Sequence, residues 1–185
     1  CAAASKGHSA GLTSVAFSPD GTTAETSTYL KSRRRGDEAS GRCTATLEGH
    51  PGHVSSVVFS PDGATLATTS DDDGTCRLWD VASGQHAATL EAHHCVFRIT
   101  SVAFSPDGTT VAAVSDDGLC YLWDVECGQH MTTWICHNRR ATSVAFSPDG
   151  ATVATTSDDG SCRLWEAASG WRTPPWRATL AGSPA

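Results

Sequence analysis

A segment of eight residues that occurs four times constrains the fold of this chain more than any other feature. It reads Ser-Val-Ala-Phe-Ser-Pro-Asp-Gly, with Val58 in place of Ala in one copy. The four copies are Ser14–Gly21, Ser56–Gly63, Ser101–Gly108 and Ser143–Gly150. Their phenylalanines are 42, 45 and 42 residues apart. A fixed period of this length indicates an array in which each repeat is one supersecondary unit that packs against its neighbours.

A second block, which ends in Trp-Asp or Trp-Glu, follows three of the four copies. The three blocks are Ser70–Asp80, Ser115–Asp124 and Ser157–Glu166. In the first repeat the residue aligned with the tryptophan is Gly36, and the basic segment Lys31–Arg35 precedes it. We therefore expect the first repeat to be degenerate, with a poorly anchored third strand.

Each repeat is typical of four short β-strands. Adjacent apolar residues in Val-Ala-Phe indicate a strand that is covered on both faces. Ser-Pro-Asp-Gly and Asp-Asp-Gly supply the residues that tight turns require. The pattern predicts an all-β chain with no separate second domain. The expected units are approximately residues 7–48 (degenerate), 49–91, 92–135 and 136–181.

Composition narrows the classes of function. The formal net charge is −7, which disfavours binding to nucleic acid. No apolar run reaches membrane-spanning length. Three of the eight cysteines, Cys76, Cys120 and Cys162, lie three residues before the repeated tryptophan. We expect these thiols to be reduced and buried, in a cytoplasmic or nuclear protein.

The repeats resemble those of the WD40 family, whose units begin with Gly-His and end with Trp-Asp. Gly-His occurs at Gly49-His50, and Trp-Asp occurs at Trp79-Asp80 and Trp123-Asp124. The resemblance implies a WD40-type β-propeller with about four four-stranded blades. Propellers close with four to eight blades, and only three repeats here carry the tryptophan block. We therefore expect part of a larger propeller, completed by a longer parent array or by a homodimer.

Each intact repeat also contains His, Ser and Asp, which in isolation would suggest a hydrolase triad. A single nucleophile does not explain a set that recurs with a tryptophan at the same spacing. The resemblance implies instead a buried structural tetrad of hydrogen-bonded side chains. The expected tetrads are His50, Ser70, Asp73 and Trp79; His93, Ser115, Asp117 and Trp123; and His137, Ser157, Asp159 and Trp165. We expect no catalytic residue, and the chain is not expected to be an enzyme.

Two clusters contain metal-ligand types, but neither has the spacing of a standard site. His93-His94-Cys95 and Cys136-His137 match no zinc motif. Asp71-Asp72-Asp73 lacks the alternating ligands of a calcium loop and indicates a hairpin with one extra residue. The sequence therefore predicts no metal and no cofactor.

The resemblance implies that partners dock where the histidine loops meet the aspartate hairpins. The expected face comprises His53, Ser55, Asp72, Arg98, Thr100, Asp116, Arg140, Thr142 and Asp158, with Gly11 and Thr13 in the first repeat. Arg98 and Arg140 are the expected anchors, because arginine is enriched at interface hot spots. These features predict a scaffold that binds other proteins, with neither nucleic acid nor a membrane as its main partner.

Two alternatives remain open at the level of sequence. One is a regulatory or targeting segment of a larger multidomain protein. The other is a binder of nucleic acid or phosphopeptides that uses the segment Lys31–Arg35 together with Arg98 and Arg140.

Overall fold

The computed structural model describes residues 11–28, 32–37, 43–91 and 98–171, and for 32–37 and 43–48 it describes only the backbone. Within these ranges the regular structure consists of fifteen β-strands in four antiparallel sheets. The described ranges contain no helix of the length and hydropathy needed to cross a membrane. The expected all-β class is confirmed.

Each sheet is a meander in which strands that follow one another in sequence are neighbours. The first sheet contains β1 (Leu12–Phe17), β2 (Thr23–Thr28), β3 (Ser32–Asp37) and β4 (Cys43–Glu48). The second contains β5 (Val54–Phe59), β6 (Thr65–Ser70), β7 (Thr75–Asp80) and β8 (His86–Glu91). The third contains β9 (Ile99–Phe104), β10 (Thr110–Ser115), β11 (Leu119–Asp124) and β12 (His130–Ile135). The fourth contains β13 (Ala141–Phe146), β14 (Thr152–Ser157) and β15 (Cys162–Glu166).

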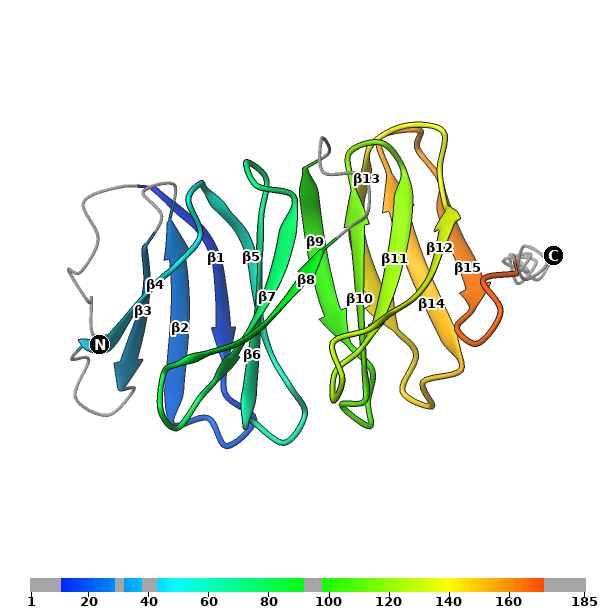
Figure 1. Ribbon diagram of the computed structural model, residues 1–185. Helices are drawn as coiled ribbons and strands as arrows, with labels where there is room; N and C mark the ends of the chain where they lie inside the picture. The colour runs from blue at the N-terminus through cyan, green and yellow to red at the C-terminus, as the bar shows by residue number, and fades with distance from the viewer. Residues whose placement is uncertain (1–10, 29–31, 38–42, 92–97, 172–185) are drawn as a thin grey trace, which may run out of the picture.

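The sheets follow one another like the blades of a fan (Figure 1). The first strand of each sheet contacts the first strand of the next, so that β1, β5, β9 and β13 line one side of the array. Among the described strands, no pairing connects the fourth sheet back to the first, and the sheets do not close into a ring. This arrangement agrees with the expectation of a partial propeller.

The third strand of the first sheet is paired on both sides, where a poorly anchored strand was expected. Strand β3 is in register with both β2 and β4. Gly36 pairs with Ala24, in the register that Trp79 has with Leu66 in the second sheet. The tryptophan is therefore absent, but the strand persists, because backbone hydrogen bonds on both sides do not depend on that side chain.

The repeated Ser-Pro-Asp-Gly segment forms a closed turn between the first two strands of each sheet. In the second sheet, the amide of Ser60 donates to the carbonyl of Thr65 over 2.8 Å, and the amide of Gly63 donates to the carbonyl of Ser60 over 2.9 Å. Oδ1 of Asp62 accepts the hydroxyl of Ser60 at 2.5 Å and the amide of Ala64 at 3.0 Å. Gly63 has a φ of 73°, which an L side chain rarely adopts. The proline, aspartate and glycine positions are thus explained by the turn.

The hydrophobic core lies between successive sheets. Val57, Phe59, Leu66 and Trp79 of the second sheet form a buried cluster that also packs against Ala16 of the first. A second cluster joins the second and third sheets, and a third joins the third and fourth. Each middle sheet is therefore covered on both faces, as the loss of apolar alternation in its sequence indicates.

A repeated polar contact also connects neighbouring sheets. The donor is the side-chain hydroxyl of the second residue of β1, β5 or β9. The acceptor is the backbone carbonyl of the residue that begins β5, β9 or β13, respectively. These bonds are Thr13 Oγ1 to Val54 O at 2.6 Å, Ser55 Oγ to Ile99 O at 2.7 Å and Thr100 Oγ1 to Ala141 O at 2.7 Å. They fix the positions of the first strands relative to one another.

Candidate functional site

A chain of buried hydrogen bonds connects the loop before β5 to the strands β6 and β7. Nδ1 of His50 lies 2.9 Å from Oδ2 of Asp73, and Nε2 lies 2.9 Å from Oγ1 of Thr68. The indole N–H of Trp79 donates to the same Thr68 oxygen over 2.9 Å. If Nδ1–H donates to the carboxylate, Nε2 accepts the threonine hydroxyl, and one tautomer satisfies the whole chain.

The fourth sheet repeats this arrangement. Nδ1 of His137 lies 3.1 Å from Oδ2 of Asp159, and Nε2 lies 2.9 Å from Oγ1 of Thr155. The indole N–H of Trp165 donates to Thr155 over 2.9 Å. The histidine, aspartate and tryptophan of both expected tetrads are therefore brought together.

The hydroxyl member of these tetrads differs from the expected one. The hydroxyls of Ser70 and Ser157 make no hydrogen bond to His50 or His137, and the hydroxyls of Thr68 and Thr155, two residues earlier, do so instead. Residues i and i+2 of a strand lie on the same face of the sheet. The sequence alone therefore identifies the face that carries the tetrad hydroxyl, but not which of the two residues on that face lies next to the histidine. Ser70 ends its strand, and its oxygen instead accepts the amides of Asp72 and Asp73 at 3.2 and 3.4 Å.

The third sheet lacks the complete chain of hydrogen bonds. Ala113 takes the place of the tetrad threonine, and the indole N–H of Trp123 donates to the carbonyl of Glu91 over 3.4 Å. The hydroxyl of Ser115 donates to Asp117. The histidine expected here, His93, lies outside the described residues. Ser115 and Asp117 are therefore brought together, but Trp123 does not contact them through a hydrogen bond.

A close approach explains the glycine of the Gly-His pair at Gly49-His50. A Cβ atom on Gly49 would lie 2.6 Å from a ring carbon of Trp79. Any side chain at Gly49 would therefore push the loop away from the indole and stretch the hydrogen bonds of His50.

The threonines of the two tetrads are not placed to act as hydrolase nucleophiles. The hydroxyl of Ser161 lies 3.2 Å from Nδ1 of His137 and donates to Oδ1 of Asp159. The hydroxyls next to Nε2 of His50 and Nε2 of His137 belong to Thr68 and Thr155, and both threonines are fully buried. A nucleophile must reach the substrate carbonyl, and neither of these oxygens is accessible to a substrate. In the second and fourth sheets, the recurring His and Asp therefore serve the packing of the blade.

The tetrad aspartates have lowered pKa values. Burial acts to raise the pKa of Asp73, but the hydrogen bonds from His50 and from the amide of Thr75 outweigh it and lower the pKa to about 2. The hydrogen bond from the hydroxyl of Ser161 is the main cause that lowers the pKa of Asp159, and His137 adds to it. Both carboxylates are therefore ionised at neutral pH and accept hydrogen bonds only.

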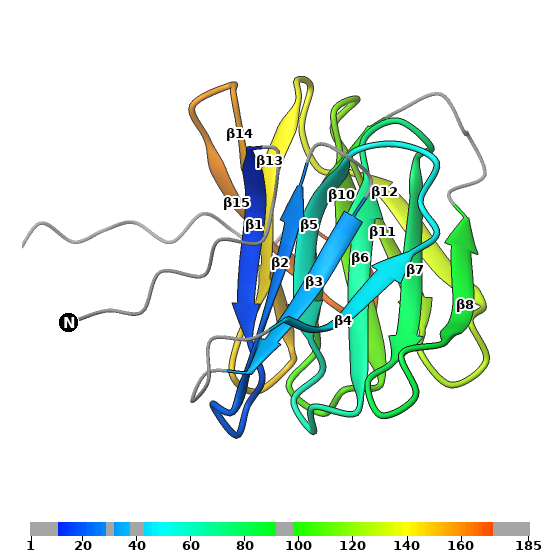
Figure 2. The same cartoon turned by 90° about the vertical axis from the view of Figure 1, so that its left-hand side faces the viewer.

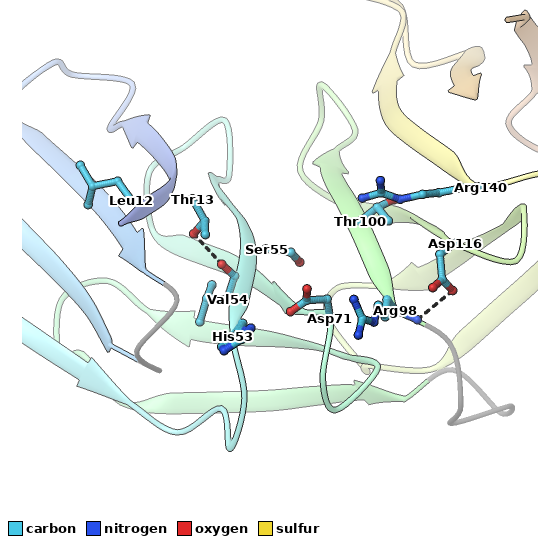
Figure 3. A pocket seen from close by; sticks show the side chains of 10 residues that line it. All are labelled: Leu12, Thr13, His53, Val54, Ser55, Asp71, Arg98, Thr100, Asp116 and Arg140. Carbon is cyan, nitrogen blue, oxygen red and sulfur yellow. Dashed lines mark hydrogen bonds between the residues drawn. The ribbon is translucent and has the colours of Figure 1, made fainter. Parts of the chain in front are cut away.

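A cavity of about 470 Å³ lies where the first strands begin (Figure 3). We call it the first-strand cavity. Its lining residues are Leu12, Thr13, His53, Val54, Ser55, Asp71, Arg98, Thr100, Asp116 and Arg140. Six of the nine residues of the expected partner face are among them, all except Asp72, Thr142 and Asp158. The structure therefore brings most of the expected face together around one opening.

Two aspartates brace the loops at the rim of the cavity. Oδ1 of Asp116 accepts the amide of Arg98 at 3.0 Å, and Oδ2 of Asp72 accepts the amide of His53 at 2.9 Å. Because the hairpin of the second sheet has one extra residue, Asp72 makes this bond and Asp71 lines the cavity. Sequence reasoning missed Asp71 by counting backward from the tetrad aspartate. Counting forward from the end of β6 identifies it.

The lining side chains differ in their availability to a partner. The hydroxyls of Thr13, Ser55 and Thr100 donate to neighbouring sheets, so they belong to the wall of the cavity. In the part of the chain that the structure describes, the guanidinium groups of Arg98 and Arg140 make no hydrogen bond or ion pair, and both residues are exposed. The two arginines are therefore available for binding.

The residues that could act as metal ligands lie in separate parts of the structure. His53, Asp71 and Asp72 each offer one ligand atom, and these atoms lie within 4.8 Å of one another. Both ring nitrogens of His137 are engaged in its tetrad. Burial raises the pKa of the Cys136 thiol to about 11, which disfavours the thiolate that a metal requires. The segment His93-His94-Cys95 lies outside the described residues.

The side chains of the basic segment Lys31–Arg35 lie outside the part of the chain that the structure describes. Lys31 lies outside the described residues, and for residues 32–37 the structure describes the backbone alone. Arg98 and Arg140 are the members of that expected patch whose side chains are described.

Together, four antiparallel meanders that contact through their first strands and buried His–Asp–Thr–Trp chains define a repeat protein of the β-propeller class. The sequence model of the family "WD domain, G-beta repeat" matches residues 1–27, 41–80, 84–124 and 128–166. The chain therefore belongs to the WD40 repeat family. No match is found among curated proteins. WD40 domains are in general non-catalytic scaffolds that mediate protein–protein interactions.

Proposed function

We propose that this chain is a non-catalytic scaffold that binds a protein partner at the first-strand cavity. The observation that carries the proposal is the pair Arg98 and Arg140, which lie at this cavity without a hydrogen bond or ion pair among the described residues. Arginine at a concave site is a typical interface anchor, because its planar guanidinium group binds carboxylates through two hydrogen bonds.

The charges of the cavity suggest the chemistry of the partner. Arg98 and Arg140 are cationic, whereas Asp71 and Asp116 supply negative charge beside them (Figure 3). A peptide segment with an acidic side chain next to an amide or a hydroxyl fits this mixed surface. The polar lining is less suited to a drug-like ligand, whose pockets are mostly apolar.

The alternatives receive less support. Binding of nucleic acid would depend on Lys31–Arg35, whose side chains are not described, and it would work against the net charge of −7. A regulatory or targeting role within a larger protein is compatible with the same cavity, since a scaffold also performs that role. The five described cysteines are free thiols, which supports the proposed cytoplasmic location.

The proposal is tested by affinity enrichment from the source cell with two variants. Arg98→Glu combined with Arg140→Glu reverses both charges at the cavity. Arg139→Glu is the matched control, because Arg139 is exposed next to Arg140 but does not line the cavity. We expect a partner that wild type and the control retain and the double variant loses. A set of bound proteins that is the same for all three would contradict the proposed site.

A further inference from the structure

In the part of the chain that the structure describes, the first sheet exposes an apolar face whose counterpart is buried in the second sheet. Leu12, Val15 and Phe17 of β1 are 60, 61 and 60% exposed. The residues at the same positions of β5, in the order Val54, Val57 and Phe59, are 0, 5 and 7% exposed. Figure 2 views the first sheet from this side, and no labelled strand lies in front of it. We call this surface the β1 face.

Within the described residues, the fourth sheet exposes its opposite face, the one that in the other sheets is turned towards the next sheet. Cys162 of β15 is exposed, whereas Cys76 and Cys120 at the same position of β7 and β11 are fully buried. Ala145 of β13 is also exposed, whereas the matching Ala103 of β9 is partly buried against the next sheet. We call the surface around Ala145 and Cys162 the β15 face.

These two faces are the two halves of a junction that occurs three times within the chain. Between the second and third sheets, Cys76 and Leu78 share one core cluster with Val102 and Phe104. Between the third and fourth sheets, Cys120 and Leu122 share one core cluster with Val144 of the fourth sheet. In the two junctions whose side chains are described on both sides, a surface like the β15 face covers the side of the next sheet that corresponds to the β1 face.

The hydrogen bonds between first strands indicate how a further sheet would attach after the fourth. Thr13, Ser55 and Thr100 each donate to the carbonyl of the first residue in the next first strand. Thr142 is the following member of this series, and its oxygen lies 2.9 Å from Oγ1 of Thr156 within its own sheet. Ser55 makes the same bond within its sheet, to Thr69 at 3.0 Å, and also donates across the junction. Thr142 therefore has the geometry to donate to the carbonyl of Leu12 in another chain.

We propose that a second copy of this chain docks through these faces, with the β1 face of each copy on the β15 face of the other. The two junctions are related by a twofold axis, and together they close eight sheets into one ring. Eight lies within the range of four to eight blades in which propellers close. One chain carries both halves, so a second copy supplies a neighbour for each face through the same first-strand contacts, with Gly36 in the place that Trp79 has in the second sheet. Leu12 belongs both to the β1 face and to the lining of the first-strand cavity, whereas Val15, Phe17 and Cys162 do not line that cavity. Variants at Val15 and Cys162 therefore test this inference without changing the site of the proposed function.

The mass of the purified chain in solution is the first test. Light scattering should give twice the mass of one chain, constant over a range of protein concentrations. A monomer at all concentrations would overturn the proposal. A series of growing assemblies would also overturn it, because it would mean that the junctions form an open array and not a ring.

Two variants and their mixture test the faces themselves. Val15→Asp places a charge on the β1 face, and Cys162→Asp places one on the β15 face; each should be monomeric alone. Each variant keeps one intact face, and these two faces are complementary. An equimolar mixture should therefore form a heterodimer with one junction, which also shows that both variants are folded. A mixture that stays monomeric would overturn the proposal.

A matched control and a chemical readout complete the experiment. Met131→Asp changes an exposed apolar residue of β12 that belongs to neither face, and it should keep the dimeric mass. In the wild type, the thiol of Cys162 should react with a labelling reagent more slowly than that of the exposed Cys127. Val15→Asp, which changes the partner's side of the junction, should raise the rate at Cys162 and leave Cys127 unchanged. Equal rates at Cys162 in both proteins would contradict the proposed junction.

Discussion

The hydroxyl oxygen of Thr68 lies 2.9 Å from Nε2 of His50, and this contact connects the loop before the second sheet to the middle of that sheet. The same oxygen accepts the indole N–H of Trp79. One buried threonine thus joins a loop and two strands. The stability of the blade should depend on this hydroxyl more than on the serine next to the aspartate hairpin.

Replacement of Thr68 by valine tests this relationship. Thr68→Val keeps the shape of the side chain but leaves His50 and Trp79 without their shared partner, which should lower the free energy of unfolding by about 1–3 kcal/mol. Ser70→Ala removes a hydroxyl whose hydrogen bonds to the hairpin amides are longer, at 3.2 and 3.4 Å. It should lower the free energy of unfolding by less than half as much. Urea unfolding of both variants is the measurement. Equal losses, or a larger loss for Ser70→Ala, would show that the tetrad is centred on the serine.

The two kinds of tryptophan should respond differently to removal of the indole N–H. Trp79→Phe breaks a 2.9 Å hydrogen bond to Thr68, whereas Trp123→Phe breaks only a 3.4 Å bond to the carbonyl of Glu91. Both indoles are almost fully buried, so the loss of packing is similar. We expect the lower melting temperature for Trp79→Phe. A larger decrease for Trp123→Phe would contradict the ranking of these two contacts.

The lowered pKa of Asp73 predicts how stability changes in acid. The pKa falls from 3.8 in the unfolded chain to about 2 in the fold, so the contribution of Asp73 is fully present above about pH 4 and is lost as the pH falls towards 2. Asp73→Asn, which does not titrate, should remove part of this loss of stability between pH 4 and pH 2. Chemical unfolding at several pH values is the measurement, with Asp158→Asn as the control outside the tetrads. An unchanged slope for Asp73→Asn would contradict the assignment.

Thiol reactivity should follow burial. Cys76 and Cys120 are fully buried, and burial raises the pKa of both thiols well above the ordinary value. The thiolate is the reactive form, so neither should be labelled in the native protein, whereas the exposed Cys127 should react. Mass spectrometry of peptides after labelling, with and without urea, is the measurement. Rapid native labelling of Cys76 would mean that the second and third sheets separate readily.

The sequence predicted the parts of this fold that depend on local chemistry. Turns such as Ser60–Gly63 were predictable because proline, aspartate and glycine each satisfy a local requirement of the backbone. The loss of the tryptophan at Gly36 led to the expectation of a weak strand, but strand pairing depends on the backbone of both neighbours. The pairing of β3 is determined by β2 and β4 on either side of it, and it cannot be read from residues 32–37 alone.

The same limit applies to the candidate site. The sequence identified the face that carries the tetrad hydroxyl, but Thr68 and Ser70 share that face and only the packing selects the threonine. Asp71 was missed because the extra residue of its hairpin shifts the count between the strand and the tetrad. Arg98 and Arg140, which the sequence places on the expected partner face, both line the cavity, because each directly precedes a first strand.

Site-specific photo-crosslinking in the source cell is the measurement that tests the binding claim most directly. A photoreactive residue in place of His53 would lie at the first-strand cavity. One in place of Glu126 would lie at a smaller cavity of about 280 Å³ near the Ser-Pro-Asp-Gly turns. We expect a crosslinked protein partner from position 53, which disappears when Arg98→Glu and Arg140→Glu are added, and none from position 126. A partner crosslinked from position 126 and not from position 53 would contradict this expectation.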